Sequence, residues 1–229
     1  QFSIRDFKED IKNNIVFVTA SIEKEVSNFQ VADEAFEKGD YKKAIEQWEV
    51  LAKQGDAASQ FKLGAMYGEG KGVPQDYKEA VRLFRLAAEQ GDASAQHNVG
   101  AMYGEGKGVP QDYKEAAKWV KLAAEQGFAK AQYNLGVMYD KGKGVPQDYK
   151  EAVRLYRLSA EQGDASAQYN LGMMYLGGKG VPKHYVIAHM WFNLSTSNGY
   201  ALGRTRRNMV EKKMTPEQIE KAQDMAINW

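Results

Sequence analysis

The chain has 229 residues, 31 of them basic and 30 acidic, so no global charge predicts binding to nucleic acid or to an anionic membrane. It contains no cysteine, which excludes disulfides, thiolate metal sites and cysteine nucleophiles. No run approaches the roughly 18 apolar residues of a membrane-spanning helix, so no integral membrane segment is expected.

Residues 1–30 form the first predicted element, an amphipathic helical segment. Its apolar side chains recur at spacings of three or four: Ile4, Phe7, Ile11, Ile15, Val18, Ile22, Val26 and Phe29. One interpretation is a cap that shields the apolar end of the helices that follow. The other is a docking or dimerisation helix, which would make the protein a homo-oligomer through residues 1–30. The mixed charge of its polar face argues against a strongly cationic membrane-surface helix.

The centre of the chain is repetitive. The sequence GAMYGEGKGVPQDYKEA at 64–80 recurs unchanged at 100–116, 36 residues later, and looser copies follow at 136–152 and 172–188. A fixed period of this length is typical of a stacked repeat array. We expect four helix–loop–helix repeats, at 57–92, 93–128, 129–164 and 165–200. Residues 31–56 predict a shorter unit of the same kind, and residues 201–229 predict terminal capping helices.

Each repeat carries the local chemistry of two helices joined by a turn. Glycine inside a helix costs about 1 kcal/mol relative to alanine, so a glycine in every copy predicts close approach of a neighbouring helix. These positions are Gly64, Gly100, Gly136 and Gly172. Gly70 and Gly72 permit left-handed backbone angles, and Pro74 prevents the first helix (57–68) from continuing. We expect Asp76 to cap the second helix, with Glu79 as its capping-box partner.

The repeated pattern A-x-A-Q-x-N-L-G-x-M-Y-x-x-G-x-G-V-P-x-D-Y-x-x-A resembles the Sel-one-like repeat (SLR), a branch of the tetratricopeptide superfamily. The resemblance implies an all-α, right-handed α-solenoid with capping helices at both ends. It also implies a bacterial, non-enzymatic adaptor or regulator that binds a protein or peptide without a cofactor. Many such relatives are exported. Since the chain begins at Gln1, we expect a periplasmic or secreted protein if a signal peptide preceded it, and a cytoplasmic one otherwise.

Binding positions can be carried over from the superfamily, in which the first helices line a concave groove and hold peptides with Asn and basic residues. In this sequence the matching side chains are Phe61, Lys62, His97, Asn98, Tyr133, Asn134, Tyr169 and Asn170. An amide both donates and accepts hydrogen bonds, so a row of them can hold a peptide backbone, with flanking aromatic rings adding apolar contact. The alternative is that the Asn side chains brace the stack. Two further variable series share this side: Ala65, Ala101, Val137 and Met173; Gly68, Gly104, Asp140 and Leu176.

Other charged positions favour structural roles. Two basic rows on the second helices are predicted to lie on a solvated convex face, paired with nearby glutamates. These rows are Arg82, Lys118 and Arg154, and Arg85, Lys121 and Arg157.

Signals for chemistry are weak. GEGKG at 68–72 lacks the spacing of a phosphate-binding loop, and His184 and His189 are five residues apart rather than four, so no metal site is expected. The S-x-x-K pattern of penicillin-recognising serine enzymes occurs at 21–24 and 59–62, without its S-D-N and K-T-G companions. An envelope hydrolase, as claimed for disulfide-rich SLR relatives, and a self-assembling structural protein are therefore the alternative functions.

Overall fold

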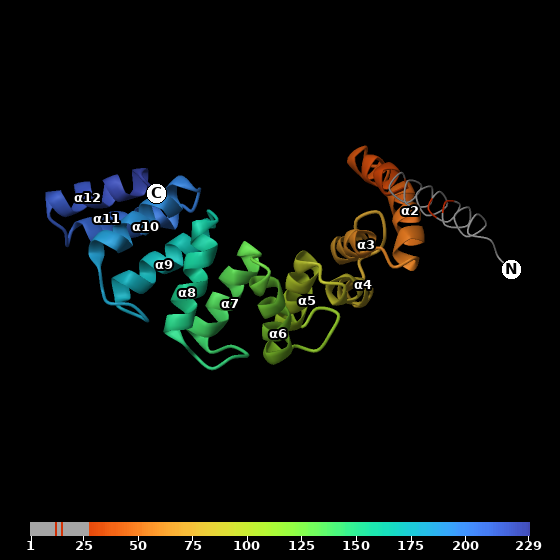
Figure 1. The fold of residues 1–229 in the computed structure, drawn as a ribbon, viewed down its shortest axis with the longest axis horizontal. Helices are drawn as coiled ribbons and strands as arrows, with labels where there is room; N and C mark the ends of the chain where they lie inside the picture. Colours follow the sequence, from red (N-terminus) through yellow and green to blue (C-terminus); the bar gives the residue numbers. More distant parts are fainter. Residues whose placement is uncertain (1–11, 13–14, 16–27) are drawn as a thin grey trace. The chain divides into compact units, whose positions relative to one another are not determined.

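The computed structural model describes residues 12, 15 and 28–229. The predicted amphipathic segment 1–30 therefore lies outside the described residues, apart from Lys12, Ile15 and residues 28–30. The described residues form helices and turns with no strand, which confirms the all-α solenoid class. The chain divides into two compact units, Gln1–Gln90 and Gly91–Trp229 (Figure 1).

The first unit contains a helix over 28–37 and three further helices: α2 (Tyr41–Lys53), α3 (Ala57–Glu69) and α4 (Tyr77–Glu89). Trp48 on α2 is fully buried, among Ala44 of the same helix and Leu63 of α3. α3 packs against both α2 and α4. The predicted shorter unit at 31–56 and the first full repeat thus share one apolar core in this unit.

The second unit continues the alternation of first and second helices. Its helices are α5 (Ala93–Glu105), α6 (Tyr113–Glu125), α7 (Ala129–Lys141), α8 (Tyr149–Glu161), α9 (Ala165–Gly177), α10 (Tyr185–Ser197), α11 (Leu202–Glu211) and α12 (Pro216–Ile227). Each repeat packs its own pair together, and α6 and α8 also pack on the first helix of the next repeat. α11 and α12 cover α10, at the blue end of Figure 1.

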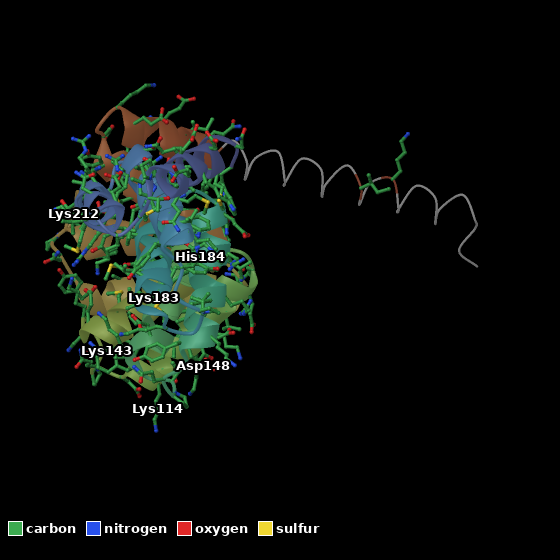
Figure 2. The ribbon with its side chains drawn as sticks, turned by 90° about the vertical axis from the view of Figure 1, so that its left-hand side faces the viewer. Lys114, Lys143, Asp148, Lys183, His184 and Lys212 are labelled. Atoms are coloured by element: carbon green, nitrogen blue, oxygen red, sulfur yellow. The ribbon has the colours of Figure 1, made fainter. Side chains whose placement is uncertain are left out.

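The predicted aspartate caps are present. The Asp76 side chain accepts hydrogen bonds from the backbone N–H groups of Lys78 and Glu79. Asp112 and Asp148 act in the same way in the following copies. In the last repeat His184 occupies this position, and its Nδ1 accepts a hydrogen bond from the Ile187 N–H. This helix is therefore capped by an imidazole instead of a carboxylate; Figure 2 labels His184 and Asp148.

The predicted capping box was wrong. The backbone N–H of Asp76, which Glu79 was expected to bind, already donates to the carbonyl oxygen of Tyr67 at 2.9 Å. Glu79 instead accepts two hydrogen bonds from the Arg82 guanidinium, at 2.8 and 2.6 Å. Charge-assisted bidentate pairing of this kind is stronger than a single neutral bond. The equivalent pairs Glu115–Lys118 and Glu151–Arg154 confirm that the first basic row is paired with glutamate.

The helix-interior glycines lie where the two helices of one repeat come closest. A Cβ added at Gly100 would lie 2.5 Å from Cγ2 of Val120 and 3.0 Å from the carbonyl oxygen of Ala116, both on α6. Gly64, Gly136 and Gly172 face Phe84, Tyr156 and Phe192 in the same way. The prediction of close helix approach is therefore confirmed, with the partner helix belonging to the same repeat.

The glycine-rich loop also joins one repeat to the repeat before it. Gly144 has a φ of 74°, and a Cβ there would overlap the backbone of Tyr113, the first residue of α6. The neighbouring Lys143 places its ammonium 5.0 Å from the centre of the Tyr113 ring, a cation–π contact. Lys179 makes the equivalent contact with Tyr149 at 5.1 Å. The loop therefore packs against the preceding repeat as well as connecting the two helices of its own.

Candidate functional site

The predicted amide positions form side-chain bonds between successive first helices. Asn134 Nδ2 on α7 lies 2.8 Å from His97 Nε2 on α5, across 37 residues of sequence. Asn170 on α9 hydrogen-bonds the Tyr133 hydroxyl on α7 with the same offset. Asn98 hydrogen-bonds its neighbour His97. Asn134 and Asn170 therefore connect their repeats to the ones before them, whereas Asn98 bonds within its own helix.

The series of Asn positions continues one period beyond the last residue that the sequence predicted, Asn170. Arg206 on α11 follows Asn170 by 36 residues, and its Nε donates a hydrogen bond to the Tyr169 hydroxyl at 3.1 Å. Sequence reasoning missed Arg206 because the repeats were closed at residue 200. Extending the 36-residue spacing into the terminal helices would have found it.

The aromatic positions lie against the second helix of their own repeat. Ring centres are 5.6 Å apart for Phe61 and Phe84, 6.0 Å for Tyr133 and Tyr156, and 5.6 Å for Tyr169 and Phe192. Each of the four aromatic positions is half-buried. Tyr169 also contacts the Tyr200 ring, with centres 5.0 Å apart, and His97 contacts the Phe128 ring at 5.4 Å. The aromatic series can therefore serve packing and contact with a partner together.

Two predicted residues have local roles that affect their chemistry. Lys62 forms an ion pair with Asp33 at 3.3 Å, and its ammonium lies 5.6 Å from the Trp48 ring. Burial lowers the pKa of His97, partly opposed by its hydrogen bond to Asn98. His97 is therefore a neutral imidazole near pH 7, able to accept the hydrogen bond from Asn134.

A hollow of about 330 Å³ opens beside α9. Its lining brings the predicted Tyr169 and Asn170 together with Met173, Leu176, Asp140 and Tyr156. Met173, Leu176 and Asp140 belong to the variable series that share the face of the predicted site. The structure therefore places two of the predicted residues on the rim of a real concavity. We call this concavity the α9 hollow.

The residues that the structure describes offer little for catalysis. They contain no group of three His, Cys, Asp or Glu side chains that could hold a metal ion. Ser59, the serine of the S-x-x-K pattern at 59–62, is fully buried, and Lys62 is engaged with Asp33. His189 is also fully buried, with Nε2 2.8 Å from the Glu211 carboxylate. Within the same residues, no helix is long and apolar enough to cross a membrane.

A family model described as Sel1 repeat matches residues 57–92, 93–128, 129–164 and 165–200. The chain belongs to the Sel1 repeat family. Sel1 repeat proteins are generally non-catalytic scaffolds for protein interaction, so the family supports the coarse functional class predicted from the sequence.

Two solved structures are similar to this Sel1 repeat protein. A protective antigen of uropathogenic Escherichia coli with an SLR fold is 35% identical, with a TM-score of 0.81, over 92% of this chain and 47% of the antigen. A Sel1 repeat protein from Oxalobacter formigenes is 31% identical, with a TM-score of 0.76, over 88% of this chain and 84% of that one. This chain thus spans about half the length of the E. coli antigen. None of the curated proteins matches it.

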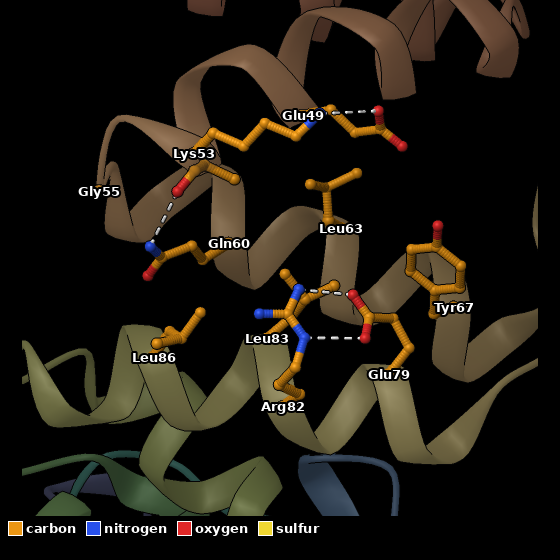
Figure 3. A pocket seen from close by; sticks show the side chains of 11 residues that line it. Glu49, Lys53, Gly55, Gln60, Leu63, Tyr67, Glu79, Arg82, Leu83 and Leu86 are labelled. Carbon is orange, nitrogen blue, oxygen red and sulfur yellow. Dashed lines mark hydrogen bonds and ion pairs between the residues drawn. The ribbon is translucent and has the colours of Figure 1, made fainter.

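A second type of cavity lies between successive second helices. In the first unit it measures about 440 Å³ and is lined by α2, α3 and α4 (Figure 3). Its charged groups already have partners, since Arg82 binds Glu79 and Lys53 lies 3.7 Å from Glu49. The equivalent cavity around Arg154 in the second unit measures about 380 Å³. These cavities offer no unpaired charge to a ligand, so the α9 hollow is the stronger candidate.

Sequence reasoning also missed a buried glutamine clamp. The Gln132 side chain donates to the carbonyl oxygen of Ala124 in the preceding repeat and accepts from Gln162 at 2.8 Å. Gln60, Gln96 and Gln168 lie at the same position, and each accepts a side-chain hydrogen bond from the residue that ends the second helix. The available signal was a glutamine repeated in every copy among the small apolar residues of the first helix. Its role is structural, because all four glutamines are buried.

Proposed function

We propose that this Sel1 repeat protein is a non-enzymatic scaffold that holds a protein or peptide segment against the face formed by α5, α7 and α9. The observation that carries the proposal is the α9 hollow, because it lies at the variable positions of an otherwise repetitive surface. A scaffold needs conserved geometry in its packing positions and freedom on the surface that selects the partner. The hollow has that freedom, since its apolar wall is supplied by Met173 and Leu176, where other copies have Ala65 and Gly68.

The bracing bonds of the Asn series do not exhaust its hydrogen-bonding capacity. A primary amide has two N–H donors and one carbonyl acceptor. The bond between Asn134 and His97 uses one of these groups, and the bond between Asn170 and Tyr133 uses one more. We infer that the remaining groups are available to the backbone of an extended partner segment. Each such bond contributes only about 0.5–1.5 kcal/mol, so apolar contact in the α9 hollow must add the rest.

The bracing role also determines which variants test the proposal. Replacing Asn134 or Asn170 by Ala would remove bonds between repeats together with any bonds to a partner. Met173 is a cleaner target because it lines the α9 hollow and appears in no bracing bond among the described residues. The matched control is Leu122, an apolar residue of the second helix α6 that is 45% exposed.

The test compares the affinity of a purified partner, identified by cross-linking from the native cell, for Met173→Glu and Leu122→Glu. We expect Met173→Glu to weaken binding by about tenfold or more, because it places a hydrated charge where an apolar side chain of the partner would sit. Leu122→Glu should bind as the parent does. Equal affinity of the parent and both variants, with all three folded, would refute binding on this face.

The remaining expectations about enzyme activity, assembly and location are proposals with separate tests. A hydrolase using Ser59 would cleave peptidoglycan or nitrocefin, and Ser59→Ala would abolish that turnover.

Assembly through residues 1–30 predicts a smaller oligomer when those residues are deleted, measured by light scattering. Export to the periplasm or beyond predicts that the protein is found outside the cytoplasm when cells are fractionated.

A further inference from the structure

Two residues at the α9 hollow depart from the repeat pattern, and both departures introduce a polar group. Asp140 occupies a position where the other copies have Gly68, Gly104 and Leu176. Tyr156 occupies a position where the other copies have Phe84, Val120 and Phe192. Since the other repeats fold without either group, packing of the repeat does not require them.

Asp140 is poorly placed for helix stability. It is the second-last residue of α7, where the backbone carbonyls concentrate partial negative charge and a carboxylate is unfavourable. No ion pair to its carboxylate forms among the residues that the structure describes, although ion pairs form elsewhere on α6 and α8. The Gln147 side chain donates a hydrogen bond to the backbone carbonyl of Asp140, not to its carboxylate. Gln75 and Gln111 donate to the equivalent carbonyls of Gly68 and Gly104. The contact of the carboxylate within the fold is with the Tyr156 hydroxyl, whose pKa it raises.

The Tyr156 hydroxyl lies near Asp140 and Asn170 without a well-formed hydrogen bond to either. Tyr156 is fully buried, and its hydroxyl has no hydrogen-bond partner among the described residues. Burial, the charge of Asp140 and the approach of its carboxylate to the hydroxyl raise the pKa of Tyr156, and the approach of Asn170 opposes this rise. A buried hydroxyl without a partner destabilises a fold, whereas the phenylalanine found in other copies would not. Tyr156 lines the α9 hollow, where a ligand would supply a well-placed partner for its hydroxyl.

We propose that the α9 hollow is a subsite for an arginine side chain of the partner segment. Asp140 would accept hydrogen bonds from the guanidinium, the Tyr156 hydroxyl would accept another, and Tyr169, which also lines the hollow, would contact the cation. Met173 and Leu176 would line the methylene stem. The volume of about 330 Å³ is sufficient for one side chain. This inference rests on the proposed scaffold function and specifies the chemistry of its partner.

One residue of the hollow has the opposite charge. Lys179 also lines it, with an ammonium that lies over the Tyr149 ring at 5.1 Å. An acidic guest would use Lys179 and be repelled by Asp140, whereas an arginine guest would use Asp140 and be repelled by Lys179. Neutralising each residue in turn therefore gives effects of opposite sign for the two kinds of guest.

The experiment is an NMR titration of the full chain, labelled at its methionine methyl groups, with N-acetyl-arginine N-methylamide and with the matching glutamate compound. We expect the arginine compound alone to shift the Met173 signal. Asp140→Asn should weaken that binding by about fivefold or more, since it removes a charged hydrogen-bond acceptor, and Lys179→Met should strengthen it. Glu161→Gln is the control, because this exposed carboxylate lies on α8 and does not line the hollow.

Tyr156→Phe distinguishes a ligand site from a pair in which Tyr156 and Asp140 only stabilise each other. We expect it to weaken arginine binding while leaving the melting temperature equal or higher, as the phenylalanine copies suggest. A lower melting temperature in both Tyr156→Phe and Asp140→Asn would show that the two groups stabilise each other, and would overturn the inference. Binding of the glutamate compound, or no shift with either compound, would also overturn it. Loss of the partner in Met173→Glu would still support the scaffold function in that case.

Discussion

A pair of glycines on α5 tests how the repeat is packed. Gly100 and Gly104 both lie inside this helix, and replacing either by alanine removes the conformational cost of glycine, about 0.5–1 kcal/mol. Their surroundings differ. At Gly104 a new Cβ would lie 3.9 Å from the Ala116 Cβ, an ordinary contact. At Gly100 it would lie 2.5 Å from Val120 Cγ2 and 3.0 Å from a backbone oxygen, which cannot rotate away.

The two variants should therefore change stability in different directions. Overpacking a tight contact costs about 1–3 kcal/mol, which exceeds or cancels the gain from removing glycine. We expect Gly104→Ala to stabilise the protein by about 0.5–1 kcal/mol and Gly100→Ala to destabilise it by up to about 2 kcal/mol. Urea unfolding followed by circular dichroism at 222 nm measures the difference, provided that the m-value is unchanged. If Gly100→Ala were as stable as Gly104→Ala, close helix packing would not explain the repeated glycine.

Two further predictions concern the polar bonds between repeats. Burial lowers the folded pKa of His97 below its unfolded value of about 6.5, so the unfolded state binds more protons as pH falls. Stability should be full above about pH 6.5 and decrease as pH falls towards the folded pKa, and His97→Phe should reduce that dependence in unfolding curves at pH 5 and 8. Gln132→Ala removes two side-chain hydrogen bonds, one to the Ala124 carbonyl and one from Gln162, and at about 0.5–1.5 kcal/mol each it should cost about 1–3 kcal/mol. Gln147→Ala, an exposed loop control, should cost less, and equal losses would contradict the clamp.

The sequence predicted the fold well wherever one residue type had one physical use. Asp76 before a helix and Gly70 after one have strong local preferences, and both act as expected. The capping box failed because Glu79 had two available partners. Whether Glu79 binds the backbone N–H of Asp76 depends on whether the Tyr67 carbonyl already accepts from that N–H, and this contact crosses the loop.

The candidate site was predicted less completely. The 36-residue spacing placed Tyr169 and Asn170 on one face, where both line the α9 hollow, but it could not show how one repeat is rotated on the next. That rotation decides that Asn134 reaches His97 across the repeat boundary. The sequence alone did not single out Asp140; the proposal for it rests on its place in the α9 hollow and on the lack of an ion pair to its carboxylate among the described residues.

Site-specific photo-cross-linking shows directly whether a partner binds the face of α5, α7 and α9. A photoreactive benzoylphenylalanine is placed either at Met173 in the α9 hollow or at Leu122 on α6, and the yield of cross-linked partner is measured. We expect a cross-link from position 173 that excess unlabelled partner abolishes, and little from position 122. A partner that cross-links from position 122 and not from position 173 would contradict it.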